Sequence, residues 1–324
     1  MSLSHYPNGV TSFGIPVMPM GTYGNVYYVC QTANSVVYQD MLLKFGGEVY
    51  ENDGSAILHT TIQSALNATV ANREDYVFVC TDSSDYDITA ALTMTKKGVH
   101  LIAPGGLSHN GGIPGNAVRI HQNTASTECL TITADCVEVA GFFFKGAADS
   151  DIINLSGTRW HNYIHHNFIG GTTTEGAAIY QIGGTGAVNQ CTISDNYIMA
   201  GYSPGGSDVT ISGCIGFTSN SSNRNLIARN IICTGQRTIV TAGVLLGGQD
   251  DLMLDNIFYE AVGGTLGDGT FTEAWNNGVT TIAMGNKLAM DTPANSGGTA
   301  DKTNVLNYSS TDGGLYNTGL IEAS

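Results

Sequence analysis

A short pattern of polar and apolar positions recurs along the chain. In each copy an asparagine follows an apolar residue by three positions and precedes another by two. The copies are YIHHNFI, TISDNYI, LIARNII, MLDNIF and AMGNKL, centred on Asn167, Asn196, Asn230, Asn256 and Asn286. Successive asparagines are 29, 34, 26 and 30 residues apart. Repeats of this length with irregular spacing are typical of the coils of a solenoid joined by variable loops.

The apolar residues on both sides of each asparagine are expected to point into a core. They are Ile164, Ile193, Ile227, Met253 and Ala283 before it, and Ile169, Ile198, Ile232, Phe258 and Leu288 after it. An asparagine between them suits a bend, because Asn tolerates the left-handed backbone conformation and its amide can bond local backbone or an identical amide one coil away. The pattern predicts a stacked asparagine ladder inside a β-solenoid.

Further strands are predicted between these segments. They are GAAIYQIG (176–183), DVTISGCIGF (208–217), TIVTAGVLLG (238–247) and TFTEAW (270–275), with DYVFVC (75–80), DITAALTM (87–94) and GVHLIAPGG (98–106) nearer the start. The run CLTITADCVEVAGFFF (129–144) alternates with a period of two, which indicates strand and not helix. With 42 glycines and 7 prolines, the composition fits short strands and frequent corners. The predicted class is all-β.

One short helix is predicted where the solenoid begins, in TTIQSALNATV. Thr60 and Gln63 match a capping box. The helix would cover the open end of the first coil, which otherwise exposes strand edges and apolar core. Its apolar face is predicted to consist of Ile62, Ala65, Leu66, Thr69 and Val70.

The first thirty residues have a different character and predict an extended arm. Proline at positions 16 and 19 opposes both a helix and a central strand, so the arm should lie along another surface. Its candidate assembly residues are Tyr6, Pro7, Phe13, Ile15, Pro16, Val17 and Pro19. The alternative is a β-strand that simply begins the solenoid.

Together the repeat and the N-terminal string resemble a known architecture. The repeat is similar to right-handed parallel β-helices, found in pectate-lyase-like enzymes and in many bacteriophage surface proteins. The string YPNGVTSFGIPVMP followed by GNVYYV resembles the N-terminus of β-helix proteins of marine tailed phages. The resemblance implies an arm and junction over 1–55, a β-helix over 56–290 and a tail over 291–324. It also implies a homotrimer.

Composition restricts the partners. A net charge of −15 with 12 Lys plus Arg opposes binding to nucleic acid or to an anionic membrane. No apolar run is as long as a membrane span, and MSLSHYPNG lacks the features of a signal peptide, which predicts synthesis in the host cytoplasm. The seven cysteines form no CxxC pair and are interpreted as buried free thiols. No cofactor is expected.

Candidate chemistry lies in the residue just before each asparagine. Stacked coils should align His166, Asp195, Arg229, Asp255 and Gly285 in one outward column, about 5 Å apart. The column could be an acid/base site on a glycan-binding face, with Asp195 and Asp255 as paired carboxylates. Their separation of roughly 10 Å slightly exceeds the inverting range of about 6.5 to 9.5 Å. The alternative, which we favour, is a solvated charge ladder that keeps the strands in register.

Two weaker patterns complete the search for sites. His161, His165 and His166 could bind a metal, but the bend should make His165 and His166 diverge, and no carboxylate lies at ligand spacing in the sequence. Pectate-lyase-like enzymes show Asp clusters for calcium with a catalytic Arg or Lys. Asp250 and Asp251 with Arg224 or Arg229 are the nearest equivalent in this sequence.

The sequence therefore predicts a structural protein of a phage virion, a role that requires no catalysis; if the chain is an enzyme, it is a polysaccharide lyase or a glycosidase. It would decorate or cement the capsid through its arm, with the major capsid protein or other virion proteins as partners. The first alternative is a tailspike that binds or cleaves a host surface glycan, and the second is a polysaccharide lyase. Only two tryptophans are present, which disfavours a glycan-cleaving face.

Overall fold

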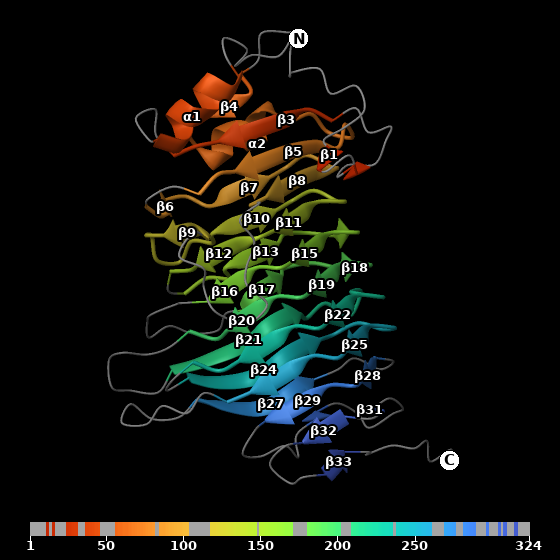
Figure 1. Ribbon diagram of the computed structural model, residues 1–324. Coiled ribbons are helices and arrows are strands. Elements are labelled where there is room, and N and C mark those ends of the chain that lie inside the picture. The colour runs from red at the N-terminus through yellow and green to blue at the C-terminus, as the bar shows by residue number, and fades with distance from the viewer. Residues whose placement is uncertain are drawn as a thin grey trace.

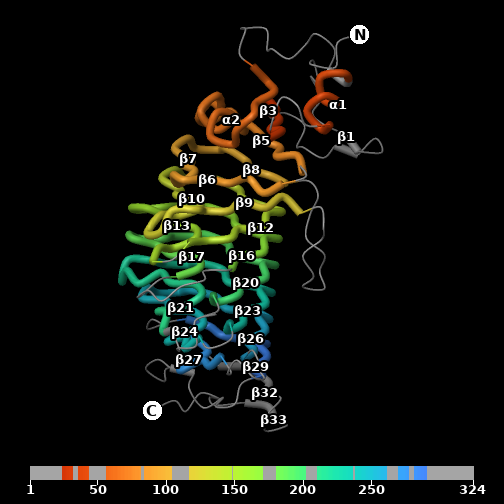
Figure 2. Tube along the Cα trace, turned by 90° about the vertical axis from the view of Figure 1, so that its left-hand side faces the viewer, coloured from red at the N-terminus to blue at the C-terminus, as the bar shows by residue number. Residues whose placement is uncertain are grey.

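The chain folds into a right-handed parallel β-helix, shown in two views in Figures 1 and 2. Helix α2 (Ile62–Ala68) and strand β3 (Val26–Val29) lie near one end of the rod, and β32 (Asn307–Ser309) and β33 (Gly314–Tyr316) lie at the other (Figure 1). The computed structural model describes residues 11–12, 15–16, 24–31, 36–45, 56–81, 84–103, 117–147, 149–170, 180–201, 209–235, 238–260, 269–276, 281–289, 296–297, 304–305, 307–309 and 314–316.

Three long sheets form the walls of the rod. The 8-stranded sheet contains β7 (Leu92–Met94), β10 (Leu130–Ile132), β13 (Ile153–Leu155), β17 (Tyr180–Gly184), β21 (Val209–Phe217), β24 (Thr238–Leu246), β27 (Thr270–Asn276) and β30 (Ser296–Gly297). The 11-stranded sheet contains β4 (Leu58–His59), β3 (Val26–Val29), β5 (Asp75–Val79), β8 (Val99–Ile102), β11 (Glu138–Ala140), β15 (Tyr163–His165), β19 (Thr192–Ser194), β22 (Leu226–Ala228), β25 (Leu252–Leu254), β28 (Ile282–Met284) and β31 (Asn304–Val305). The 10-stranded sheet contains β6 (Tyr86–Ile88), β9 (Val118–Gln122), β12 (Phe142–Lys145), β16 (Phe168–Gly170), β20 (Tyr197–Met199), β23 (Ile231–Cys233), β26 (Ile257–Tyr259), β29 (Lys287–Ala289), β32 (Asn307–Ser309) and β33 (Gly314–Tyr316).

Four strands and two helices complete the described elements. Strand β14 (Arg159–Trp160) pairs in parallel with β18 (Val188–Asn189), and β1 (Thr11–Ser12) pairs antiparallel with β2 (Ile15–Pro16). The helices are α1 (Val36–Phe45) and α2 (Ile62–Ala68). The predicted strand run 129–144 is in fact three strands, β10, β11 and β12, each in a different sheet. Its alternation is interrupted by two corners, which sequence periodicity did not reveal.

The predicted core is confirmed by the register of the coils. Residues three before the asparagines pair directly from strand to strand, as in Ile164 with Ile193 and Ile227 with Met253. All ten predicted inward residues are at most 2% exposed. Burial of these stacked apolar columns, at about 25 cal/mol per Å² of apolar surface, is the main force that holds the coils together.

Helix α2 covers the N-terminal end of the solenoid, as predicted. Ile62, Ala65 and Leu66 are buried and join the core cluster. Two details of the prediction were wrong. The N-cap is Thr61, whose side chain accepts a hydrogen bond from the Ser64 amide, because the helix begins one residue later than expected. Val70 is 47% exposed, because the helix ends at Ala68 and the chain turns away.

The sheets extend beyond the predicted range of 56–290 at both ends. Strand β3 pairs with β5 and β4, so the segment before residue 56 supplies a strand of the 11-stranded sheet. After residue 290, β30, β31 and β32 each continue one of the three sheets. In the predicted arm, Ile15 and Pro16 form β2, whereas Tyr6, Pro7, Phe13, Val17 and Pro19 lie outside the described residues.

The predicted asparagine ladder forms the corner between the 11-stranded and 10-stranded sheets. From Asn196 onward, each amide oxygen accepts from the side-chain amide of the asparagine one coil earlier, for example Asn196 Nδ2 to Asn230 Oδ1 at 3.0 Å, and from its backbone amide at 3.0 Å. Each Nδ2 also donates to a carbonyl of the preceding coil, as Asn230 does to Ile193. All five asparagines are at most 2% exposed.

The left-handed conformation does not fall on the asparagines themselves. It falls on the residue before each of them, at φ values of 52° to 57° for His166, Asp195, Arg229 and Asp255 and 71° for Gly285. The bend is placed one residue earlier because each asparagine must keep its amide inside the corner. The prediction that the asparagines adopt the left-handed conformation is therefore wrong. The prediction that their amides bond from coil to coil is confirmed.

A second polar ladder, not predicted, forms the corner between the 8-stranded and 11-stranded sheets. It occupies the position five residues before each asparagine, namely Asn162, Cys191, Asn225, Asp251 and Thr281. Asn162 Oδ1 accepts from the Val137 amide, and Asp251 Oδ1 accepts from both amide groups of Asn225. The residues before Asn162, Cys191, Asn225 and Asp251 again have positive φ, between 52° and 59°. Strands β15, β19, β22 and β25 are therefore closed at both ends by the same device.

Candidate functional site

The predicted outward column exists. The left-handed residues His166, Asp195, Arg229 and Asp255 follow consecutive strands of the 11-stranded sheet, and the backbone amide of each donates to the coil after it. The geometry brings all four residues onto one edge of the rod. Two of their side chains are bonded to each other, so the four do not act as independent groups.

Asp195 and Arg229 bind each other. Arg229 Nε lies 2.7 Å from Asp195 Oδ1, and its terminal nitrogen lies 2.6 Å from Oδ2, which is a bidentate pair. Burial alone would raise the pKa of Asp195, but the hydrogen bonds and charge of Arg229 lower it. A carboxylate with a lowered pKa whose oxygens both accept from a guanidinium is a poor general acid. The pair matches the favoured interpretation of this column as a charge ladder.

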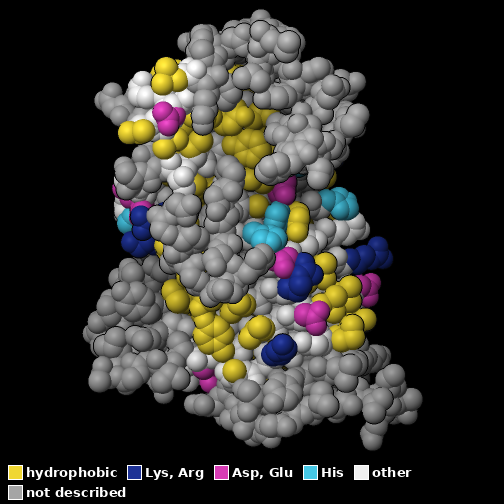
Figure 3. Space-filling view, in the orientation of Figure 1, with side chains coloured by type: hydrophobic (Ala, Val, Ile, Leu, Met, Phe, Trp, Pro, Cys, Tyr) yellow, Lys and Arg dark blue, Asp and Glu magenta, His cyan; other side chains and the backbone are white. Residues whose placement is uncertain are grey.

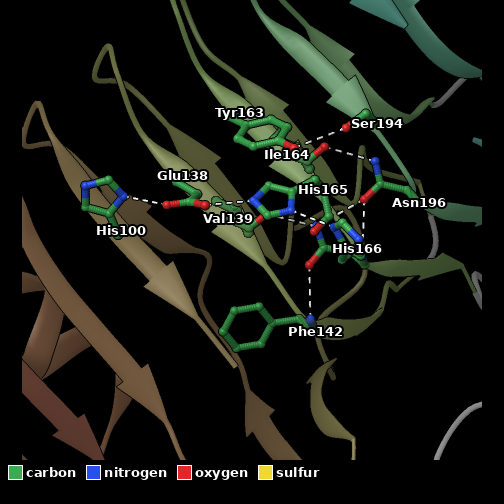
Figure 4. A network of polar contacts seen from close by, with 11 residues as sticks. His100, Glu138, Val139, Phe142, Tyr163, Ile164, His165, His166, Ser194 and Asn196 are labelled. Carbon is green, nitrogen blue, oxygen red and sulfur yellow. Dashed lines mark hydrogen bonds and ion pairs between the residues drawn. The ribbon is translucent and has the colours of Figure 1, made fainter. Parts of the chain in front are cut away.

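The predicted divergence of His165 and His166 is wrong. Their Nδ1 atoms are 2.8 Å apart, so the imidazoles meet edge to face at the bend (Figure 4). A carboxylate also lies beside them, since His165 Nε2 is 2.8 Å from Glu138 Oε1 on β11, one coil earlier. His161, the third histidine of the predicted metal cluster, lies at the opposite end of β15, where its ring is close to that of Trp160.

The network continues toward the N-terminal end. Glu138 Oε2 is 2.6 Å from His100 Nδ1, and His100 Nε2 is 3.0 Å from Glu74 Oε2. Glu138 thus lies between two imidazoles, as Figure 4 shows. We call the chain Glu74, His100, Glu138, His165 and His166 the histidine–glutamate network.

The electrostatics of this network are cooperative. Burial alone would raise the pKa of Glu138, but hydrogen bonds and charges from His100 and His165 lower it to about 2. Burial alone would lower the pKa of His100, but bonds from Glu138 and Glu74 raise it. Two tyrosines cover the imidazoles: Tyr76 stacks on His100 with centroids 4.1 Å apart, and Tyr163 on His165 at 3.8 Å. The arrangement holds charged groups in place and shields them, which is characteristic of a structural network as much as of a site.

Sequence analysis missed Glu138, His100 and Glu74, although a signal was present. The segment VEVAGFFF fits the repeat if Phe142 takes the place of the asparagine, since Val139 then lies three before it and Phe144 two after it. Gly141, at φ 86°, takes the left-handed position, and the Phe142 amide donates to Asn167 Oδ1 at 3.0 Å. Aligning this sixth copy would have placed Glu138 beside Tyr163 and next to His165.

Asp251 cannot take the role that the pectate-lyase-like pattern gave it. It is fully buried in the second ladder, whereas Asp250 and Arg224 are exposed and 3.9 Å apart. Burial raises the pKa of Asp251 to about 6, although two hydrogen bonds from Asn225 oppose that rise. Its Oδ2 is buried and has no hydrogen-bond partner. A surface calcium site at Asp250 and Asp251 is thereby excluded.

Another carboxyl group with a shifted pKa is Asp151, which lies just before β13 and is affected by the charge of Glu128, just before β10. Asp151 Oδ1 accepts from the Tyr180 amide at 3.0 Å, and its Oδ2 lies above Gly183, where any Cβ would collide with it. Burial, together with the charge of Glu128, raises the pKa of Asp151 to about 6. Asn154 Nδ2 donates to Glu128 at 3.3 Å. A carboxyl group with a pKa near neutrality beside a second carboxylate has the properties of a general acid.

Metal binding and membrane insertion find no support in the described part of the chain. Within it, no group of three or more His, Cys, Asp or Glu side chains is arranged to hold a metal ion. No helix among the described residues is long and apolar enough to span a bilayer. All seven cysteines are free, which confirms one half of the interpretation, but Cys80 and Cys136 are only partly buried, so the other half holds for five of them. Burial raises the pKa of Cys129 and Cys191 to about 12.

Comparison with known proteins gives no relative for this chain. No protein-family model, no curated protein and no solved structure matches it.

Proposed function

We propose that the chain is a structural protein of a bacteriophage particle, a β-helix that decorates or cements the capsid through its N-terminal arm. The resemblance of the N-terminal string to β-helix proteins of tailed phages supports the phage assignment. A homotrimer bound to the major capsid protein or to other virion proteins is the assembly that this resemblance implies. The virion is the corresponding location.

The observation that carries the structural role is that Asp195 and Glu138, two carboxylates of the outer face, are already fully engaged by neighbouring side chains. Arg229 engages both oxygens of Asp195, and the two oxygens of Glu138 bind two imidazoles. Groups engaged in this way hold neighbouring coils in register, which a rigid particle component requires. They are poorly suited to proton transfer, because a substrate would first have to break their bonds.

A glycan-cleaving tailspike is the second candidate, favoured by one observation. Asp151 has a pKa raised to about 6 beside Glu128, and such a pair could protonate a leaving group. The competing explanation is that Asp151 joins two coils through the Tyr180 amide. In this candidate the catalytic site would lie at Asp151 and Glu128, and not at the predicted residues His166, Asp195, Arg229 and Asp255.

The first experiment locates the chain on particles from its source. Purified particles would be analysed by mass spectrometry for this chain, and a cryo-EM map would be searched for the rod. Density on the shell at lattice axes is the expected result. Density on the tail would favour the tailspike, and absence of the chain from particles would overturn both proposals.

The arm is tested by deleting residues 2–20 and measuring incorporation of the chain into particles. Loss of incorporation with an unchanged thermal unfolding midpoint is expected, whereas unchanged incorporation would defeat the anchoring role. Catalysis is tested with host polysaccharide and the purified chain. Depolymerisation that is lost in Asp151→Asn but kept in Asp195→Ala would establish the enzyme in place of the structural protein.

A further inference from the structure

Exposed apolar side chains concentrate on one part of the 11-stranded sheet. Seven large hydrophobic side chains are strongly exposed in the described part of the chain, and three of them lie together on β25 and β28: Leu252 (37%), Ile282 (38%) and Met284 (41%). Leu226 continues the column of Leu252 and Ile282 through the parallel register. In the view of Figure 3, hydrophobic side chains gather at this level with charged side chains beside them. We call this region the β22–β28 face.

Charges of opposite sign lie at the ends of two neighbouring strands of this face. Strand β22 has Arg224 before it and Arg229 after it, whereas β25 has Asp250 and Asp255 at the equivalent positions. All four are exposed; Arg224, Arg229 and Asp250 have 67%, 57% and 57% of the side chain accessible. One coil is therefore positive at both ends and the next is negative at both ends.

This arrangement is complementary to itself in one orientation only. A two-fold axis that runs along the strand direction between β22 and β25 places β22 of one copy opposite β25 of a second copy, with the two rods antiparallel. Both arginines of each copy then face both aspartates of the other, and Leu226 faces Leu252. A parallel arrangement would instead place arginines on arginines and aspartates on aspartates. We propose that the β22–β28 face binds the same face of a second copy of this chain in antiparallel orientation.

A second copy fits this face better than an acidic or a basic partner. The chain has a net charge of −15, so two copies repel each other over most of their surface. On this face Arg224 and Arg229 lie among Asp195, Asp250 and Asp255, so the excess of negative charge is smaller than over the rest of the surface. Complementary charge selects partner and orientation, and an isologous contact requires the patch to complement itself. The exposed apolar column between the charges supplies the surface to be buried. The inference does not depend on the proposed phage function, and a homotrimer would form through other surfaces of the rod.

The test is charge reversal followed by rescue, read out by sedimentation equilibrium at low salt over a range of micromolar concentrations. The chain mass is 34.0 kDa. The two-fold contact is expected to pair whichever unit, monomer or trimer, the chain otherwise forms. Arg224→Asp with Arg229→Asp should therefore halve the wild-type mass, because the ends of both strands are then negative. Adding Asp250→Arg and Asp255→Arg restores complementarity only in the antiparallel orientation, so the fourfold variant should associate again. High salt should weaken the wild-type contact.

A matched control separates this contact from net charge. Arg119→Asp with Lys287→Asp changes the net charge by the same amount on exposed positions of the 10-stranded sheet and should leave the mass unchanged. Circular dichroism confirms that each variant is folded. A wild type of 34.0 kDa throughout, a mass that the double variant does not change, or failure of a folded fourfold variant to associate would each overturn the proposal.

Discussion

The two corner ladders of this β-helix perform the same task with different chemistry. At the first corner every position from Asn167 to Asn286 is an asparagine, and each side chain both donates to and accepts from neighbouring coils. At the second corner the members vary. Asn162 donates its backbone amide to Cys191 Sγ at 3.4 Å, and the Oδ2 atom of buried Asp251 has no partner.

The difference indicates which corner contributes more to the register of the coils. An unsatisfied buried polar group costs about 1 to 3 kcal/mol, so a ladder whose members are all satisfied selects one register strongly. The second corner includes a thiol and a carboxylate with one unsatisfied oxygen, so it selects the register less strongly. The asparagine corner should therefore dominate stability.

The largest effect is expected from Asn230→Ala. The change removes the acceptor for the Asn196 backbone and side-chain amides and the donor to Ile193 and Asn256. Because these buried partners lose their bonds together, the free energy of unfolding should fall by about 3 to 5 kcal/mol. Urea denaturation measures it. Cys191→Ala at the other corner is the matched control and should cost roughly half as much or less; equal costs would contradict the ranking of the corners.

Asp251→Asn should stabilise the protein, which would identify a weakness of the second corner. Burial raises the pKa of Asp251 from 3.8 to about 6, so between these values the folded state binds more protons than the unfolded state. Stability from this group is therefore present at low pH and is lost as pH rises from about 4 to about 6.

An asparagine avoids that loss, so the variant should gain about 2 kcal/mol at pH 7 and little at pH 4. Thermal unfolding midpoints across this pH range give the comparison. Asp255→Asn, exposed in the same coil, is the control and should change stability by less than about 0.5 kcal/mol. A gain for Asp251→Asn that did not depend on pH would show that charge at the second corner is not the cause.

Glu138→Gln extends the comparison from the buried ladders to the partly exposed network. The pKa of Glu138 is lowered to about 2, so its contribution is present above about 4.5 and is lost as pH falls toward 2. The pKa of His100 is raised above its usual 6.5, so that contribution is present below 6.5 and is lost as pH rises through the raised value.

The variant should therefore lose about 1 kcal/mol of stability between pH 4.5 and 6.5, and less on either side. Unfolding free energies of wild type and variant at several pH values test this window. Glu74→Gln, which removes only the more exposed partner of His100, should show a smaller difference. A cost for Glu138→Gln that was the same at every pH would assign the effect to packing and not to charge.

The smallest effect is expected from Arg229→Ala. The pair with Asp195 is bidentate, but the arginine side chain is 57% exposed, and exposed pairs contribute about 0.5 kcal/mol or less. Arg224→Ala, whose contact with Asp250 is 3.9 Å long, should be close to neutral. Chemical denaturation at low and high salt resolves both. If Arg229→Ala lowered the free energy of unfolding as much as Asn230→Ala does, the outer column would contribute as much to stability as the inner ladder, which contradicts the ranking.

Much of the fold could be predicted from the sequence because the pattern that defines it lies within a single coil. The inward residues and the ladder asparagines recur at fixed offsets within each coil, so a pattern of a few residues predicted them. The histidine–glutamate network was harder to predict. Glu138 and His165 are 27 residues apart, and His100 and Glu138 are 38 apart, because coils differ in loop length. The repeat aligns Glu138 with His165 only if Phe142 is accepted in place of the asparagine, and no copy of the asparagine repeat includes His100.

By itself the sequence determined that the chain is an all-β solenoid, which side chains fill its core and which asparagines stack. These follow from side-chain periodicity and from the chemistry of the amide, both expressed within a single coil. The tertiary structure decided where the bend falls, that Asp251 is buried while Asp250 is exposed, and that His165 meets Glu138. Those outcomes depend on contacts between coils, and stacking alone converts distant positions in the chain into neighbours about 5 Å apart.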